Sequence, residues 1–130
     1  MTEHLILVIE DDLDQHFLYS RYFSKSGLQI ESHFFTGIDK AIEFLDSTTK
    51  IPDLIITDKD VPPSSGFKML EYIKSQKNLN ECPAIMISGH LSQGEHQRAL
   101  SLGAVEALIK PISSDKMHSD IQNIINRYLK

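Results

Sequence analysis

The chain alternates between short apolar runs and longer segments in which apolar residues recur at helical spacing. The runs are about five or six residues long and rich in β-branched side chains, which indicates β-strands. They cover residues 5–9, 29–35, 53–57, 84–88 and 105–109. The run at 29–35 is weaker and more polar than the others, whereas those at 5–9, 53–57 and 84–88 are apolar enough for strands buried on both faces.

Five segments with helical periodicity fill the remaining chain. Their approximate limits are residues 13–26, 39–46, 65–76, 92–102 and a last helix that starts near residue 114. In the first helix the apolar residues include Leu13, Phe17 and Phe23, and Gly27 follows as a natural C-cap residue. Strands alternating with helices predict an α/β fold with a parallel sheet covered by helices on both faces. A length of 130 residues suits one domain, which we expect to span residues 1–130.

Composition and charge narrow the class of protein. The chain is 41% hydrophobic and 24% charged, as in ordinary soluble proteins. Its longest apolar run is too short to span a bilayer, and its start lacks the features of a secretory signal. The single cysteine, Cys82, excludes an internal disulfide and fits a reducing cytoplasm. A net charge of −5 and scattered basic residues argue against nucleic-acid binding. We therefore expect a cytoplasmic protein without membrane insertion.

Polar side chains gather where the strands are expected to end. In open α/β sheets, ligands bind beyond the carboxyl ends of the strands, so these positions carry the functional prediction. Four of the five strand ends supply such groups, namely Glu10, Asp11 and Asp12, then Asp58 and Asp60, then Ser88, and finally Lys110. Carboxylates of this kind suit a hard divalent cation such as Mg²⁺, which would also relieve their mutual repulsion.

These groups are the parts of a phosphoryl-transfer site. Beside a cation, a carboxylate can act as nucleophile and form an acyl phosphate. The Ser88 hydroxyl and the Lys110 ammonium are suited to hold phosphoryl oxygens. Taken singly, each group has a simpler explanation, and Asp12 is best interpreted as a helix N-cap. The coincidence of four strand ends that serve one reaction favours phosphotransfer.

The sequence resembles the response-regulator receiver domain of two-component signalling over essentially its whole length. The matching motifs are Leu-Val-Ile-Glu-Asp-Asp at residues 7–12, Asp58 with Pro62 and Gly66 behind it, Ile-Ser-Gly at 87–89, and Lys-Pro at 110–111. The resemblance implies a flavodoxin-like doubly wound sheet of strand order 2-1-3-4-5 with five helices. It also implies a stand-alone, chemotaxis-regulator-like receiver without turnover of a separate substrate.

Roles for individual residues follow from the same resemblance. Asp58 would be the phosphoacceptor, and Mg²⁺ would be held by Asp11 and Asp58, by Glu10 through water, and by the backbone carbonyl of Asp60. Ser88 would bind the phosphoryl group and move on activation, and Lys110 would pair with that group. The Lys110–Pro111 bond is expected to be cis. A sensor histidine kinase or a histidine phosphotransfer protein would be the donor. If Lys130 ends the natural chain, a downstream protein partner would receive the output; the alternative is a receiver excised from a longer protein.

Three positions depart from the family pattern. Ala107 stands three residues before the lysine, where receivers usually carry Tyr or Phe as a reporter of activation. Asp60 and His90 occupy two positions that tune the lifetime of the phosphate in the family. We therefore expect an altered rate of phosphate loss and an unusual route from the acceptor to the output surface.

Other functions fit parts of the pattern. The segment Asp58-Lys59-Asp60 resembles the Asp-x-Asp motif of haloacid-dehalogenase-type phosphatases, but those enzymes carry the nucleophile after their first strand. A receiver-like interaction module that is never phosphorylated is favoured by Ala107 and Asp60, while the complete set of acids, hydroxyl and lysine argues against it. Flavin and P-loop nucleotide sites are disfavoured because no Gly-rich phosphate loop follows the first strand.

Overall fold

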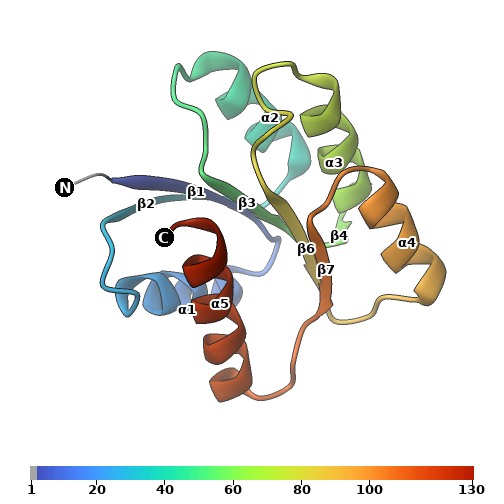
Figure 1. Cartoon of the computed structure of the whole chain (residues 1–130). Coiled ribbons are helices and arrows are strands. Elements are labelled where there is room, and N and C mark those ends of the chain that lie inside the picture. Colours follow the sequence, from blue (N-terminus) through green and yellow to red (C-terminus); the bar gives the residue numbers. More distant parts are fainter. Residues whose placement is uncertain (1–2) are drawn as a thin grey trace.

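Five parallel strands form the central sheet, in the order β2-β1-β3-β6-β7 (Figure 1). Their bounds are β1 (His4–Ile9), β2 (Ile30–Phe35), β3 (Leu54–Thr57), β6 (Ala84–Ser88) and β7 (Glu106–Ile109). The structure is a computed structural model and describes residues 3–130. Counting only the strands of this sheet, the order is 2-1-3-4-5, so the predicted topology is confirmed.

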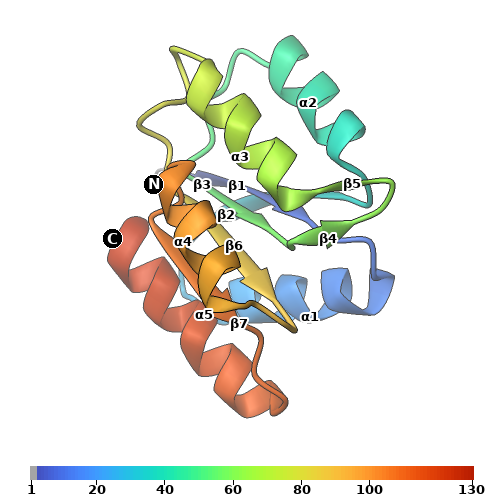
Figure 2. The same cartoon turned by 90° about the vertical axis from the view of Figure 1, so that its right-hand side faces the viewer.

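Helices cover both faces of the sheet (Figures 1 and 2). Helices α1 (Leu13–Ser24) and α5 (Ser114–Tyr128) lie on one face. Helices α2 (Ile38–Ser47), α3 (Gly66–Ser75) and α4 (Gln93–Ser101) lie on the other. Within residues 3–130, no helix is both long and apolar enough to cross a membrane.

The alternation of side chains along β1 builds two separate cores. Leu7 and Ile9 pack into the cluster beneath α2, α3 and α4, while Ile6 and Val8 pack into the cluster beneath α1 and α5. Successive residues of a strand point to opposite faces, so a strand covered on both sides needs apolar residues at every position. This explains why the first strand is an unbroken apolar run.

Helix α1 buries Phe23, one of the three apolar residues noted in its sequence, and exposes the other two. Leu13 and Phe17 are 69% and 63% exposed, whereas Tyr19, Tyr22 and Phe23 are buried against the sheet and α5. The sequence did not define a single apolar face for this helix, because aromatic residues lie on more than one of its sides. The packing of α1 against α5 determines which side is buried. Asp12 is the N-cap, since its Oδ1 accepts a hydrogen bond from the Asp14 backbone at 2.9 Å.

A small hairpin between β3 and α3 was not predicted. It consists of β4 (Asp60–Val61) and β5 (Ser64–Ser65), which pair in antiparallel fashion. Within residues 3–130 the cis peptide bond is Pro62–Pro63 at the turn of this hairpin. The expected cis bond at Lys110–Pro111 is therefore wrong. The trans preference of an X–Pro bond is small, so its isomer depends on the tertiary surroundings and not on the dipeptide.

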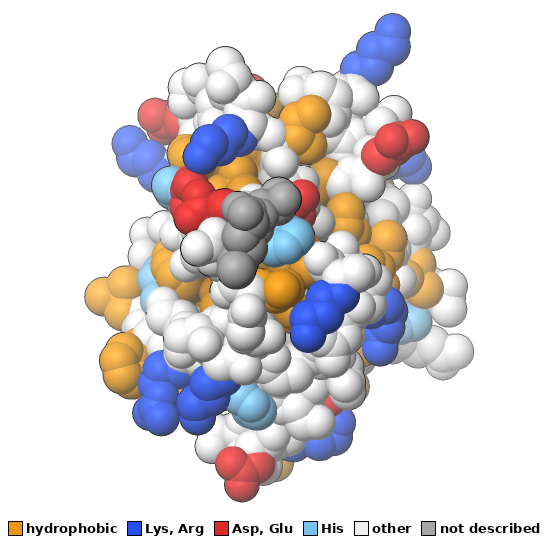
Figure 3. All heavy atoms as spheres, turned by 60° about the vertical axis from the view of Figure 1, so that its left-hand side comes forward, with side chains coloured by type: hydrophobic (Ala, Val, Ile, Leu, Met, Phe, Trp, Pro, Cys, Tyr) orange, Lys and Arg blue, Asp and Glu red, His pale blue; other side chains and the backbone are white. Residues whose placement is uncertain are grey.

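Charged side chains do not gather into a basic surface on the face that Figure 3 shows. Lys and Arg side chains are spread across it, with Asp and Glu between them. The chain as a whole carries a net charge of −5.

Candidate functional site

The backbone hydrogen bonds of the sheet continue one residue past the strands and fix the positions of three polar side chains. The Glu10 amide donates to the Phe35 carbonyl at 2.9 Å, and the Asp58 amide donates to the Ile9 carbonyl at 2.9 Å. The Lys110 amide donates to the Ser88 carbonyl at 2.6 Å. The parallel register thus places residues that are far apart in sequence at one edge of the sheet.

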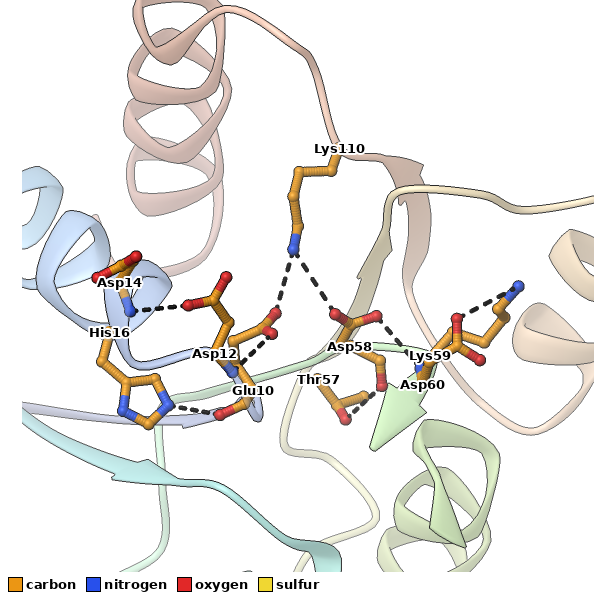
Figure 4. A network of polar contacts seen from close by, with 9 residues as sticks. All are labelled: Glu10, Asp12, Asp14, His16, Thr57, Asp58, Lys59, Asp60 and Lys110. Carbon is orange, nitrogen blue, oxygen red and sulfur yellow. Dashed lines mark hydrogen bonds and ion pairs between the residues drawn. The ribbon is translucent and has the colours of Figure 1, made fainter. Parts of the chain in front are cut away.

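The side chains of Glu10, Asp58 and Lys110 converge at this edge (Figure 4). Lys110 Nζ lies 3.1 Å from Glu10 Oε2 and 3.6 Å from Asp58 Oδ2. The Glu10 side chain is 4% exposed and the Asp58 side chain 11%, so water screens these charges less than at the open surface. One ammonium group therefore bridges two partly or fully buried carboxylates.

Carboxylates outnumber cations in the cluster. Ligand oxygens of Glu10, Asp11 and Asp58 all lie within 4.8 Å of one another. Burial, with the neighbouring Asp58 adding to it, raises the pKa of Glu10 to about 8. The donor set consists of carboxylate oxygens only, which is the chemistry that a hard divalent cation prefers. The residues present therefore fit a magnesium ion.

The loop after β3 holds Asp58 through backbone contacts. The Asp60 amide donates to Asp58 Oδ1 at 3.2 Å, and the Thr57 hydroxyl donates to the Asp58 carbonyl at 2.9 Å. The Gly66 amide donates to the Lys59 carbonyl at 2.7 Å and closes the hairpin. The hairpin thus orients one carboxylate oxygen of Asp58, while Lys110 faces the other.

The remaining predicted residues lie around this centre in different environments. Ser88 is buried at the end of β6, and Ala107 of β7 is buried next to Met86. The Asp60 side chain and His90 are exposed, as is Asp11 at the mouth of the acidic cluster. The structure therefore brings Glu10, Asp11, Asp58 and Lys110 together and leaves the Asp60 carboxylate at the rim.

Two residues of the site were missed from the sequence. His16 Nε2 lies 2.5 Å from the Glu10 carbonyl oxygen, and its ring stacks on Phe34. The Lys59 side chain is 9% exposed, and its ammonium group lies 3.2 Å from Glu95 Oε1. The sequence around Lys59, a lysine between two aspartates, does not indicate that its side chain is buried. His16 could have been noticed only as a ring in the first turns of a helix that starts at the acidic cluster.

The chain is similar to a known family over most of its length. The model of the response regulator receiver domain matches residues 6–122. The chain belongs to the response regulator receiver domain family. This receiver is 29% identical over 127 residues to the two-component response regulator ORR3 of Oryza sativa subsp. indica, covering 95% of this chain and 89% of that one. The family prediction is thereby confirmed.

Other relatives are longer than this receiver. It is 31% identical over 126 residues to the two-component response regulator-like APRR3 of Arabidopsis thaliana, of which it spans 24%. It is 27% identical over 123 residues to the transcriptional regulatory protein GltR of Pseudomonas aeruginosa, of which it spans 49%. These matches cover 95% and 94% of the receiver itself.

Solved structures share the same fold. The phosphorylated cyanobacterial phytochrome response regulator RcpA superposes with a TM-score of 0.93 at 19% identity, covering 99% of this chain and 96% of that one. The Mn²⁺-bound form of the response regulator Rcp1 superposes with a TM-score of 0.89 at 20% identity, covering 98% and 95%. At this level of identity the likeness establishes the flavodoxin-like architecture.

Proposed function

We propose that this receiver accepts a phosphoryl group on Asp58 with the help of Mg²⁺ and thereby changes its contacts with a partner protein. The observation that carries the proposal is the convergence of Lys110 with Glu10 and Asp58 at the carboxyl edge of the sheet. The donor would be a sensor histidine kinase or a histidine phosphotransfer protein, the partners that family membership supports. The whole of residues 1–130 would serve as one phosphoacceptor domain in the cytoplasm.

Asp58 is better placed as the acceptor than its neighbours. Glu10 is 3% exposed and its raised pKa favours the protonated, less nucleophilic form. Asp58 is more accessible, and both of its oxygens have partners that orient them. In the transfer, an Asp58 oxygen forms the new P–O bond while the P–N bond to the donor imidazole breaks and its electron pair returns to that nitrogen.

Lys110 and Ser88 would hold the transferred group. Lys110 Nζ, 3.6 Å from Asp58 Oδ2, is close enough to pair with a phosphoryl oxygen attached there. Ser88 lies at the end of the strand next to β3 and can donate its hydroxyl proton. These two groups would stabilise the negative charge of the acyl phosphate from one side.

Asp11 and Asp58 would bind Mg²⁺ directly, with Glu10 acting through water and the Asp60 backbone carbonyl as a further ligand. The cation would supply charge neutralisation at the phosphoryl oxygens. The carboxylate donor set supports this assignment. The response regulator Rcp1, which has the same fold, has been solved in a Mn²⁺-bound form.

The stability of the metal-free domain should fall as the pH rises from about 5 to about 8. The pKa of Glu10 is about 8 in the folded state, whereas a glutamate in the unfolded chain has its ordinary pKa of 4.5. Between these two pKa values the folded state binds more protons, so the free energy of unfolding decreases with pH. Mg²⁺ should offset this loss, and the rise in Tm on adding Mg²⁺ should be larger at pH 8 than at pH 5. Thermal unfolding with and without Mg²⁺ measures this, and an equal rise at both values would contradict it.

The decisive experiment is incubation with acetyl phosphate. The intact mass should increase by one phosphoryl group in the presence of Mg²⁺ and remain unchanged when a chelator removes the cation. Proteolytic mapping should place the added mass on the peptide that contains Asp58. A chain that never gains mass, and that does not bind the phosphoryl mimic beryllofluoride, would instead be a non-phosphorylated interaction module, the second candidate that Ala107 favours.

A further inference from the structure

Helix α4 buries little apolar surface against the rest of the domain. Within Gln93–Ser101, all of which the structure describes, Ala99 is the one buried residue. Figure 2 shows helices α3 and α4, and two cationic side chains link them. The Arg98 guanidinium lies 4.2 Å from the centre of the Phe67 ring, and Lys74 Nζ donates to the Ser101 carbonyl at 3.1 Å. A helix with so little apolar burial can shift at low cost.

A third cation ties the first turn of α4 to the acceptor loop. Lys59 directly follows Asp58, and its ammonium group lies 3.2 Å from Glu95 Oε1. The same Glu95 oxygen accepts the Ser92 amide at 2.9 Å, and Ser92 Oγ accepts the Glu95 amide at 3.1 Å. Lys59 therefore reaches the capping box that starts the helix. The Lys59 side chain is 9% exposed and the Glu95 side chain 35%, so water screens the lysine end of this ion pair less than the glutamate end.

Ala107 does not provide the aromatic side-chain route from Asp58 to this face. Ala107 is buried beside Met86 on the neighbouring strand, and its methyl group cannot span the distance that an aromatic ring would. The backbone supplies one link, since Ser88 precedes the N-cap Ser92 by four residues. Lys59 supplies the side-chain link from the acceptor loop.

We propose that the Lys59–Glu95 ion pair carries the phosphorylation state of Asp58 to the first turn of α4, an inference that rests on the proposed function. An acyl phosphate adds negative charge to the residue that directly precedes Lys59 in the acceptor loop. The Asp60 carboxylate, 3.8 Å from the ammonium group, already competes with Glu95 for it (Figure 4). The added charge draws Lys59 toward the loop, and Glu95 then keeps only its cap contacts. The first turn of α4 loosens and presents an altered surface.

Hydrogen exchange of the α4 amides tests this coupling. In the unaltered chain, beryllofluoride with Mg²⁺ should speed exchange of the amides at residues 95–97 by roughly threefold to tenfold, the range expected when one partly buried ion pair is lost. In Lys59→Met these amides should exchange at the faster rate from the start, and beryllofluoride should change them less than about twofold. Lys59→Arg should retain the response because it keeps the charge.

Two further variants separate the ion pair from the helix cap. Glu95→Gln removes the charge while glutamine can still complete a capping box, so it should abolish the response as Lys59→Met does. Lys50→Met is the matched control, because Lys50 pairs with Glu31 at 3.0 Å away from the acceptor loop. It should leave the α4 response intact. If Lys59→Met fails to fold, Glu95→Gln decides the question, since Glu95 lies on the surface side of the pair.

Fluorine NMR of bound beryllofluoride distinguishes failure of the proposed function from failure of the Lys59–Glu95 coupling alone. If the unaltered chain does not bind the mimic, the proposed function fails and this inference with it. If the mimic binds and α4 responds equally in the unaltered chain, Lys59→Met and Glu95→Gln, the inference alone is overturned. Binding together with a response lost in both variants and kept in Lys50→Met supports it.

Discussion

An Asp58→Asn variant should gain no phosphoryl group from acetyl phosphate and Mg²⁺, while the unaltered chain gains one. The amide lacks the charged, nucleophilic oxygen, and Glu10 cannot replace it because its pKa is raised and its side chain is buried. Intact-mass measurement over a time course checks the result. Asp60→Asn is the matched control, since it removes an exposed acid from the same loop. It should still be phosphorylated and differ only in how fast the phosphate is lost.

The same Asp58→Asn change should stabilise the metal-free domain at neutral pH. Asp58 contributes to the raised pKa of Glu10, so without the Asp58 charge Glu10 ionises more readily and pairs with Lys110 alone. Relief of one pKa unit at Glu10 corresponds to about 1.4 kcal/mol. Thermal unfolding without metal at pH 7 should show a higher Tm than that of the unaltered chain. A lower Tm would mean that the Asp58 carboxylate stabilises the domain through Lys110 more than it destabilises the charged form of Glu10.

A Gly66→Ala variant should be less stable and a poorer phosphoacceptor. A Cβ atom at this position would lie 2.1 Å from the Asp58 carbonyl oxygen and 3.0 Å from its carbon, which is far inside van der Waals contact. The backbone that would have to move belongs to the acceptor itself, so the strain reaches the carboxylate. Overpacking of this kind costs roughly 1–3 kcal/mol. Denaturant unfolding measures the loss, and the rate of mass gain with acetyl phosphate should fall in parallel.

Gly94→Ala is the control for Gly66→Ala, because it is expected to raise the stability of the domain and not to lower it. A Cβ at Gly94 has no neighbour within 4 Å, and the residue lies inside α4 with ordinary helical backbone. Alanine should stabilise that helix by up to about 1 kcal/mol relative to glycine. Equal effects of the two substitutions would show that the close approach at Gly66 does not matter for the acceptor loop.

The carboxyl-edge site could be predicted from sequence because it depends on a general property of parallel sheets. Glu10, Asp58 and Lys110 each follow a run predicted to be a strand, and the carboxyl ends of parallel strands share one edge. Their contact therefore follows once the runs are identified as strands, and distances of 3.1 and 3.6 Å agree with it. The roles of Ser88 and of the Asp60 carbonyl in phosphate and metal binding stay predictions.

Features that depend on side chains from two or more elements could not be predicted. The burial of Lys59 follows from the position of Glu95 on α4, 36 residues further along the chain. The exposed state of Phe17 follows from how α1 docks against α5. The trans Lys110–Pro111 bond and the hairpin at residues 60–65 likewise reflect surroundings that no local pattern describes.

The sequence by itself determined the order of the elements, the sheet that they form and the edge at which the acids and the lysine meet. Hydrophobic periodicity and the rules of parallel sheets are local or general, so they can be read without coordinates. Only the tertiary structure decided which face of α1 is buried and by how much the pKa of Glu10 is raised. It also brought Lys59 of the acceptor loop into contact with Glu95 of α4. These properties depend on the distances and dielectric surroundings of groups brought together by folding.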